Sequence, residues 1–372
     1  MERDGRSYET AAARWAGVGP YYAMFPTAFS NAVVLRHTSP GDAVLDPFAG
    51  RGTSIFSAAV QERVGIGIEL NPVGWLYART KLAPASRPAV ERRIRMIGEA
   101  AEDFGAASGA LPAFFKHCFT ARVRQYLCAA REVLRWRTDQ VDRTLMALLL
   151  VYLHGKREAS LSNQMRQAKS MAPDYAVRWW QERGLEPPDV EPVDFLVKRL
   201  AWRYAKGRPT LTGSKVYLGD SVRLLPEIKH RIQTGRLQRP KLLLTSPPYY
   251  AVTNYHYDQW LRLWLLGGQP NALRVPNAGE YRDRFDNLEK YRGLLLKVFG
   301  SAAEVLSRNA IVYVRTGRGE ETYDATVAAL RAAFPRKRIR VTRRPFLRPT
   351  QTRLFGDKSV KEGEVDIVMR PR

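Results

Sequence analysis

Short apolar runs alternate with helix-length segments near the start of the chain. Residues 43–46 predict a buried strand, residues 53–61 a helix, and residues 64–69 the next short strand. A Gly-rich turn separates the first strand from the helix. A strand–helix–strand order of this kind is typical of the opening of a parallel sheet.

The hydrophobic period changes in the middle of the chain. Between residues 86 and 210, apolar side chains such as Val123, Leu127 and Leu134 recur on one helical face. Pro187 and Pro188 then interrupt the pattern. We therefore predict a mainly helical insertion, with helices over residues 121–136, 144–153 and 175–181.

Strand signals return from residue 211 onward, with helical stretches between them. The expected strands cover residues 215–218, 241–245, 310–315 and 365–369, and the expected helices cover residues 291–306 and 322–334. The fold class is therefore α/β, with a sheet that the helical zone interrupts. We divide the chain into a first α/β part over residues 1–85, a helical insertion over 86–210 and a second α/β part over 211–372.

Charge indicates the kind of partner. The 372 residues contain 60 Lys and Arg against 36 Asp and Glu, so the formal net charge is +24. A surface this basic attracts polyanions, of which nucleic acid is the commonest, and an acidic membrane face is the alternative. The longest apolar run, residues 145–153, is about half of the roughly 20 residues that span a bilayer, so we expect no membrane helix.

Other residue counts exclude further classes of protein. The first ten residues contain no apolar signal core, and Cys118 and Cys128 cannot build a disulfide framework, so we expect a cytoplasmic protein. The five His residues lack ligand-like spacing, which argues against a metal site.

The first chemical motif is the sequence DPFAGRGT over residues 46–53, followed by Glu69 at the end of the next predicted strand. A Gly-rich turn lets a ligand approach the backbone and the N–H groups at the start of a helix. A carboxylate at the end of the following strand can accept two ribose hydroxyls. The alternative is an ordinary tight turn, but the combination favours a nucleotide-like ligand.

The second motif is Ser246-Pro247-Pro248-Tyr249, directly after an apolar strand. The two prolines hold the backbone rigid at the edge of the sheet where α/β proteins bind ligands. Carbonyl acceptors beside an aromatic ring suit a flipped-out nucleobase, because they can bind an exocyclic amine and stack on the base. A strand ended by proline with a packing Tyr is the alternative, and the first motif makes it the weaker one.

Together, DPFAGRGT and TSPPY resemble the amino-methyltransferases of DNA, which methylate cytosine N4 or adenine N6 with S-adenosylmethionine. The resemblance implies a Rossmann-like methyltransferase fold, a mostly parallel sheet with helices on both faces. Ser246, Pro247, Pro248 and Tyr249 correspond to its catalytic tetrapeptide, whose Ser form is associated mainly with cytosine N4. Cofactor contacts are implied for Tyr21, Pro26, Asp46, Phe48, Ala49, Gly50, Gly52, Thr53, Glu69, Leu70, Asp220 and Ser221; a core role is an equal alternative for Phe48.

The implied enzyme is a site-specific cytosine-N4 DNA methyltransferase that extrudes its target base and transfers the methyl group directly. Adenine-N6 methylation is the nearest alternative, followed by RNA amine methylation and a DNA-binding protein without catalysis. A cognate restriction endonuclease is a potential partner, and we expect a monomer or weak dimer associated with the nucleoid. The helical insertion is a candidate for target recognition.

A basic run near the C-terminus is the candidate DNA-contact segment. Residues 335–353 hold eight basic residues among 19 and no acid. A solvated face is the usual explanation of a charge run, but this density beside a base-flipping motif favours phosphate contact. The predicted contacts are Arg336, Lys337, Arg338, Arg340, Arg343, Arg344 and Arg348. Trp179, Trp180 and Trp202 either pack the helical zone or line DNA.

Overall fold

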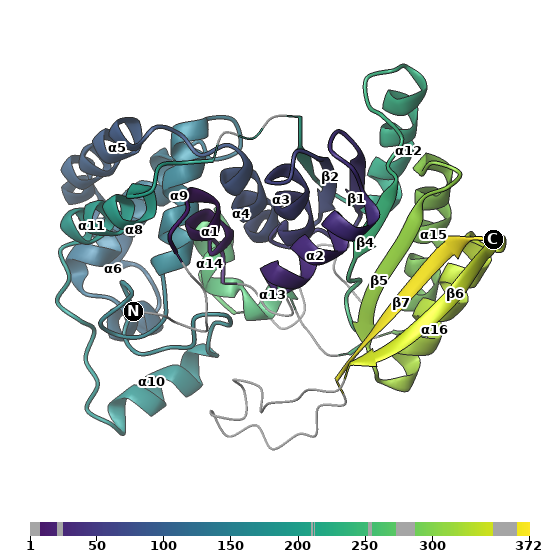
Figure 1. Cartoon of the computed structure of the whole chain (residues 1–372). Coiled ribbons are helices and arrows are strands. Elements are labelled where there is room, and N and C mark those ends of the chain that lie inside the picture. Colours follow the sequence, from purple (N-terminus) through teal and green to yellow (C-terminus); the bar gives the residue numbers. More distant parts are fainter. Residues whose placement is uncertain are drawn as a thin grey trace.

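The computed structural model describes residues 8–20, 25–209, 211, 213–251, 255–272, 287–344 and 363–372. Its centre is a seven-stranded sheet in the order β3-β2-β1-β4-β5-β7-β6 (Figure 1). The strands are β1 (Ala43–Asp46), β2 (Val64–Glu69), β3 (Lys215–Leu218), β4 (Leu242–Thr245), β5 (Ile311–Gly317), β6 (Lys337–Arg344) and β7 (Glu364–Pro371). Strand β7 runs opposite to the other six strands of this sheet, which share one direction, so the predicted Rossmann-like α/β class is confirmed.

Alternate residues of each central strand face opposite layers of helices. Leu45 and Leu243 pack against α12 (Ser221–Gln233), α15 (Leu288–Val305) and α16 (Glu320–Ala333). Val44 and Leu244 point the other way, against α2 (Thr27–His37) and α3 (Thr53–Ala59). Because both faces are covered, the central strands are apolar up to their last residues. Such continuous apolar runs are the signal that predicts them.

Strand β6 was not predicted. The segment was interpreted only as a basic run, but residues 337–344 form the edge strand and pair along their length with β7. Ile339 packs against the sheet core, whereas Arg338 and Arg340 are exposed. Since an edge strand buries little of its surface, its strand period is hidden by the charged residues that keep the edge soluble.

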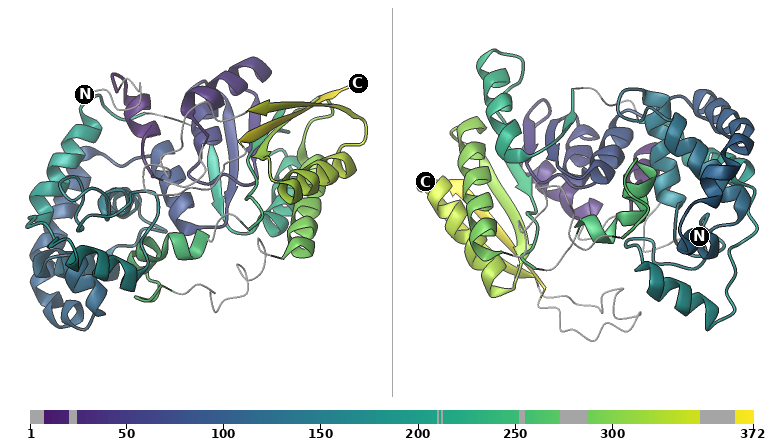
Figure 2. Two further views of the ribbon diagram at one scale, coloured as in Figure 1. Left: turned by 90° about the horizontal axis from the view of Figure 1, so that it is seen from below. Right: turned by 180° about the vertical axis from the view of Figure 1, so that it is seen from behind.

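Among the described residues between α4 (Pro72–Leu82) and β3, the regular elements are all helices, and they form a unit beside the sheet in Figure 2, so the insertion is mainly helical. They are α5 (Arg87–Ala100), the short 3-10 helix η1 (Ala101–Phe104), α6 (Gly105–Gly109), α7 (Ala113–Cys118), α8 (Ala121–Val133), α9 (Gln140–Tyr152), α10 (Pro173–Gln181) and α11 (Pro192–Tyr204).

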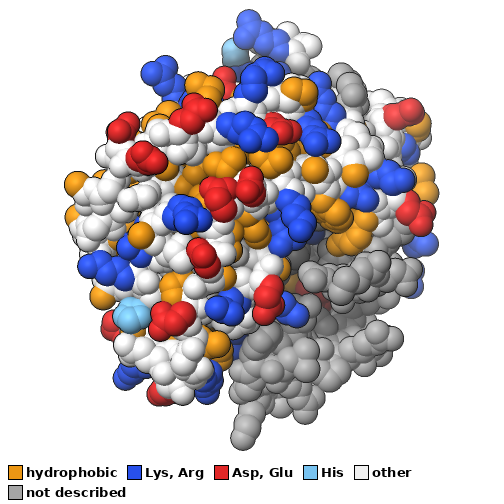
Figure 3. Space-filling model, turned by 90° about the vertical axis from the view of Figure 1, so that its left-hand side faces the viewer, with side chains coloured by type: hydrophobic (Ala, Val, Ile, Leu, Met, Phe, Trp, Pro, Cys, Tyr) orange, Lys and Arg blue, Asp and Glu red, His pale blue; other side chains and the backbone are white. Residues whose placement is uncertain are grey.

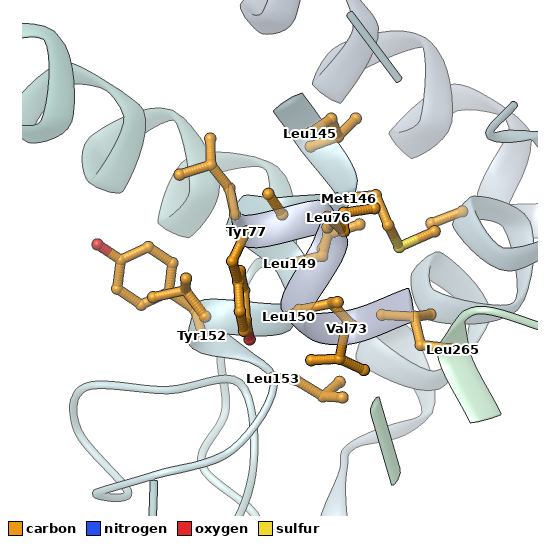
Figure 4. Close-up of a cluster of buried hydrophobic side chains, with 14 of the residues drawn as sticks. Val73, Leu76, Tyr77, Leu145, Met146, Leu149, Leu150, Tyr152, Leu153 and Leu265 are labelled. Carbon is orange, nitrogen blue, oxygen red and sulfur yellow. The ribbon is translucent and has the colours of Figure 1, made fainter. Parts of the chain in front are cut away.

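The core of this helical unit draws on distant parts of the chain. Trp15 on α1 (Ala11–Ala16) and Trp260 and Trp264 on α14 (Trp260–Leu265) are buried in it. Figure 4 shows Val73, Leu76 and Tyr77 of α4 packed among side chains of α9, with Leu265 of α14 beside them. Helix α4 therefore packs against both the helical unit and the sheet, and it joins the two. The division at residues 85 and 210 stays a prediction.

The structure favours packing for one of the three tryptophans. Trp180 is fully buried, and its indole N–H donates to the Gln164 carbonyl over 2.7 Å, so it packs the unit. Trp202 is 41% exposed, with the Arg14 guanidinium 4.7 Å from its ring centroid. Lys and Arg are interspersed with Asp and Glu over the face of this unit in Figure 3. No helix among the described residues is long and apolar enough to cross a membrane.

Candidate active site

The two motifs meet at one edge of the sheet. Strands β1 and β4 are parallel neighbours, so Asp46 and Thr245, their last residues, lie side by side. Strand β2, which ends at Glu69, flanks β1, and β3 lies next to β2. The carboxyl ends of parallel strands are where open α/β sheets bind ligands.

The glycine loop is held against helix α4. Gly52 has a φ of 73°, and a Cβ there would stand 2.6 Å from the Cβ of Ala78. A Cβ on Gly74 would lie 2.8 Å from the Gly50 carbonyl oxygen. Both positions therefore require glycine, because any side chain would force the loop and the helix apart. Predicted cofactor residues Ala49 and Thr53 are buried in this same turn.

Glu69 binds the loop through its carboxylate. Its Oε2 accepts the Gly50 N–H at 2.6 Å and its Oε1 accepts the Asn71 N–H at 2.8 Å. Burial raises the pKa of Glu69 to about 7, because desolvation of the charged form outweighs these two bonds. The carboxylate of Glu69 thus lies against the glycine loop at the end of β2.

Asp46 is the polar junction between the two motifs. Its carboxylate accepts the Phe48 N–H at 3.0 Å, the Thr245 hydroxyl at 2.6 Å and the hydroxyl of Ser54. Burial raises the pKa of Asp46 to about 6, although all three hydrogen bonds favour the ionised form. The residue organises the cofactor loop from below.

Asp220 and Ser221 join this edge from β3. The Gly219 N–H donates to the Glu69 carbonyl at 2.9 Å, and the Ser221 hydroxyl donates to the Pro47 carbonyl. The Asp220 carboxylate accepts the Val222 N–H at 3.0 Å and so caps α12. The fold therefore brings Asp220 beside Glu69, although 151 positions separate them in the sequence (220 − 69).

These residues fit the cofactor that the family resemblance implies. Two carboxylates stand at adjacent strand ends beside a loop in which Gly50 and Gly52 carry no side chain, and the buried Nδ2 of Asn71 has no hydrogen-bond partner. A buried donor without a partner is costly, so a ligand acceptor would stabilise it. Glu69 is suited to hold the ribose, and Asp220 and Asn71 the polar edge of the adenine.

The tetrapeptide directly follows β4. Ser246 is half-buried and Pro247 and Pro248 are buried. The Tyr291 hydroxyl donates to the Pro248 carbonyl at 2.9 Å, so α15 fixes the turn from behind. The Pro248 carbonyl is therefore engaged within the fold.

Tyr249 contacts one residue of β5 and one of β7. A Cβ on Gly317 would stand 3.3 Å from the Tyr249 ring, so the ring packs flat on the backbone of β5. The Tyr249 hydroxyl donates to Glu364 Oε1 at 3.3 Å. Gly317 and Glu364 are partners in the β5–β7 ladder.

Other predicted cofactor residues are placed less directly. The Phe48 ring packs edge-on against Phe299, 6.4 Å between centroids, in agreement with a core role. Leu70 lies between Glu69 and Asn71 at the end of β2. Pro26 is exposed at the start of α2, and Tyr21 lies outside the described residues.

Those predicted DNA-contact residues that the structure describes lie along β6 and at the position before it, rather than gathered at one place. Because β6 is antiparallel to β7 and thus parallel to β5, Arg343 lies near the catalytic edge and Arg338 near the opposite edge. Arg336, Arg338, Arg340 and Arg343 are exposed. Lys337 instead donates to the Ala310 carbonyl at 2.5 Å, so its side chain stabilises the fold. Arg348 and the side chain of Arg344 lie outside the described residues.

Sequence reasoning missed three residues that hold the site together. In the sequence, Thr245 differs from an ordinary strand residue only because it directly precedes Ser246. That position was the one indication that it belongs to the site. Tyr291 and Glu364 reach the tetrapeptide from 42 and 115 positions away in the sequence (291 − 249 and 364 − 249). Nothing local to either residue marks it as part of the site.

Comparison with known proteins agrees with the geometry of the glycine loop. Residues 3–74, which include the loop and Glu69, match the N6/N4 methyltransferase family model described as DNA methylase. The resemblance to the N6/N4 DNA methylases is confirmed. The tetrapeptide lies outside the matched segment, so the match does not separate cytosine N4 from adenine N6.

Individual DNA methylases match over a similarly short length. The type II methyltransferase M.Cfr9I of Citrobacter freundii is 46% identical over 54 residues, 14% of this chain and 18% of the relative. M.SmaI of Serratia marcescens is 43% identical over 53 residues, again 14% and 18%. The matched segment thus spans under a fifth of these relatives. Among solved structures, an rRNA methyltransferase of Streptomyces viridochromogenes aligns over 98% of this chain and 96% of its own, with a TM-score of 0.34 and 12% identity.

Proposed function

We propose that this protein transfers a methyl group from S-adenosylmethionine to the N4 amine of cytosine in DNA. The observation that carries the proposal is the hydrogen bond between Thr245 and Asp46. It joins the loop suited to the cofactor to the last residue of the strand that precedes Ser246, so the two motifs lie at one place. The match to DNA methylases over residues 3–74 supports the cofactor and the nucleic-acid substrate.

The chemistry requires acceptors for an amine. The lone pair of the cytosine amine is delocalised into the ring, so the nitrogen must pyramidalise before it can attack a methyl group. S-adenosylmethionine, when bound, supplies that methyl group on a sulfonium. The Ser246 hydroxyl and the Pro247 carbonyl accept the two amine hydrogens as positive charge develops, and preorganised acceptors of this kind lower the barrier.

Base extrusion accounts for the aromatic residue of the tetrapeptide. Tyr249 stacks on the extruded cytosine from a position that β5 and β7 hold rigid. Neither cysteine serves as a nucleophile, since Cys118 and Cys128 are buried in the helical unit. In-line placement of amine, methyl and sulfur then provides most of the acceleration.

The decisive experiment identifies the methylated nucleoside. Purified protein is incubated with unmethylated DNA and isotopically labelled S-adenosylmethionine, and the digested nucleosides are analysed by mass spectrometry. We expect label in N4-methylcytosine. Label in N6-methyladenine would retain amine methylation but overturn the cytosine assignment, and label only in RNA would overturn the DNA substrate.

Matched serine variants test the role of the tetrapeptide. Ser246→Ala should reduce the transfer rate at least tenfold, because one acceptor for the amine is lost. Ser307→Ala is the control, since Ser307 lies in the loop before β5 at the opposite edge of the sheet. Cofactor affinity, measured by calorimetry, should stay the same in both variants. Equal transfer rates for Ser246→Ala and wild type would remove Ser246 from the reaction.

A further inference from the structure

The hydroxyl of Tyr249 is bound by an acidic side chain that neither motif contains. Glu364, the first residue of β7, accepts it through Oε1 at 3.3 Å. The ring itself rests on Gly317, where a Cβ would come within 3.3 Å of it. The face and the polar end of the ring are therefore held separately, by β5 and by β7.

Glu364 is in turn held by a buried cation. Its Oε2 lies 3.4 Å from Nη1 of Arg315, whose Nε and Nη2 bind the two carboxylate oxygens of Asp366 at 2.7 and 3.0 Å. The Arg315 guanidinium also lies 3.5 Å from the centroid of the Phe29 ring. Such bidentate, stacked geometry leaves the guanidinium little freedom.

This arrangement exceeds what stability alone requires. Arg315 already has a full carboxylate partner in Asp366, and the second acid, Glu364, leaves a 25% exposed side chain turned toward the tetrapeptide. A second carboxylate in a half-buried place costs desolvation and repels the first. The hydrogen bond from Tyr249 explains why an acid stands at this position despite the unfavourable desolvation and repulsion.

We propose that Glu364 is a positioning residue for Tyr249: held by Arg315, it fixes the ring against Gly317 in the orientation that stacks on the extruded base. The inference rests on the proposed function. It also gives the antiparallel strand β7 a role in the reaction, because β7 carries the acid to the catalytic edge. Without the acid, the ring could turn about its side-chain torsions, and the stacking surface would be lost for part of the time.

A double-mutant cycle tests the proposal through single-turnover methyl transfer. Glu364→Ala should slow transfer about fivefold, the typical net value of one hydrogen bond, with unchanged affinity for the cofactor. Tyr249→Phe, which keeps the ring, should slow it by a similar factor. The double variant should be no slower than either single variant, because both remove the same contact.

Two further variants separate positioning from general stability. Glu364→Gln keeps an acceptor and should restore most of the rate, although the charge opposite Arg315 is gone. Glu304→Ala is the matched control: it removes a 58% exposed acid of α15 that pairs only with Lys229 among the described residues. It should leave transfer unchanged.

Fluorescence of 2-aminopurine at the target position gives a readout of base stacking. Stacking on a fixed ring quenches this fluorophore, so Glu364→Ala should raise the emission of the extruded base and Glu364→Gln should not. The positioning role would be overturned if the two single-variant reductions in transfer rate multiplied in the double variant, or if Glu364→Gln were as slow as Glu364→Ala. In either case, wild-type methylation of DNA would leave the proposed function intact. Wild-type protein that methylates no DNA would overturn the function and this inference together.

Discussion

The hydroxyl of Thr245 donates a 2.6 Å hydrogen bond to the carboxylate of Asp46, and both side chains are buried. One residue ends the strand before the tetrapeptide and the other begins the cofactor loop. Since neither can move without the other, the spacing between the two motifs depends on this contact. Hydrogen bonds to buried charged groups are among the stronger ones in proteins.

Thr245→Val removes the hydroxyl with little change of shape. We expect a loss of about 1–3 kcal/mol in the free energy of unfolding, because Asp46 keeps only two of its three donors. Transfer should slow more than the stability loss alone explains, since the loop and the tetrapeptide separate. Denaturant unfolding and single-turnover transfer measure the two effects. Thr245→Ser, which keeps the hydroxyl, should retain most of both; a Thr245→Val protein as stable as wild type would disprove the link.

Cofactor affinity should depend on pH through Glu69. In the proposed complex, the ribose hydroxyls would donate to the ionised carboxylate, but a pKa of about 7 leaves most of the Glu69 side chains protonated at pH 6. Raising the pH from 6 to 8 ionises the group, so the affinity should increase about tenfold and then level off. Calorimetry with the stable product S-adenosylhomocysteine measures this.

Two substitutions show whether Glu69 causes that pH dependence. Glu69→Gln cannot titrate and should flatten the profile, leaving only the weaker contribution of Asp46, whose pKa is about 6. Glu62→Gln, at an exposed acid on the turn before β2, should leave the profile as in wild type. A wild-type affinity that is constant from pH 6 to pH 8 would contradict a neutral-range pKa at this site.

Gly52→Ala should disrupt the cofactor loop. The new Cβ meets both an unfavourable left-handed backbone and the Ala78 side chain at 2.6 Å, so the loss of stability should exceed about 2 kcal/mol. Gly41→Ala is the matched control, because Gly41 has a φ of 83° but nothing within 4 Å of its Cβ. It should lose only the backbone contribution, about 1 kcal/mol.

A compensating change tests the steric part. In Gly52→Ala with Ala78→Gly, the 2.6 Å contact is removed, while the 3.2 Å contact with the Cα of residue 78 and the backbone strain stay. Thermal unfolding of the three variants and cofactor titration should show partial recovery of both stability and affinity. If the double variant binds the cofactor no better than Gly52→Ala, contact between the loop and α4 does not shape the site.

Position along β6 should decide which basic residues contact DNA. Arg343 stands near the catalytic edge and Arg338 about 16 Å further along the strand, at the rise of an extended chain. Arg343→Ala should weaken binding to all DNA sequences alike and lower the slope of log affinity against log salt by about 1. Arg338→Ala should change it less.

Binding measured over a range of salt concentrations tests this difference. An equal reduction in the slope of log affinity against log salt in both variants would indicate that the whole strand contacts phosphates. A loss confined to particular DNA sequences in Arg343→Ala would instead place base recognition at this residue.

The sequence alone determined the local parts of this protein. Strands β1, β2 and β3 begin and end at the predicted residues. Strands β1 and β2 are buried on both faces and their apolar runs record that burial, whereas β3 lies at the edge of the sheet and exposes Lys215. The glycine loop was also readable, since positive φ angles and close packing restrict such turns to glycine. In the same way, two prolines in succession identified the rigid tetrapeptide.

Only the tertiary structure decided which distant residues complete the site. Glu364 reaches Tyr249 because β7 pairs antiparallel with β5, and α1, α14 and the helical insertion form one core although they are far apart in sequence. Strand β6 could not be predicted from its sequence, because an exposed edge strand carries charged residues in place of an alternating apolar pattern. Local patterns report the burial of their own residues, whereas these contacts depend on which strands and helices become neighbours, and no single segment encodes that.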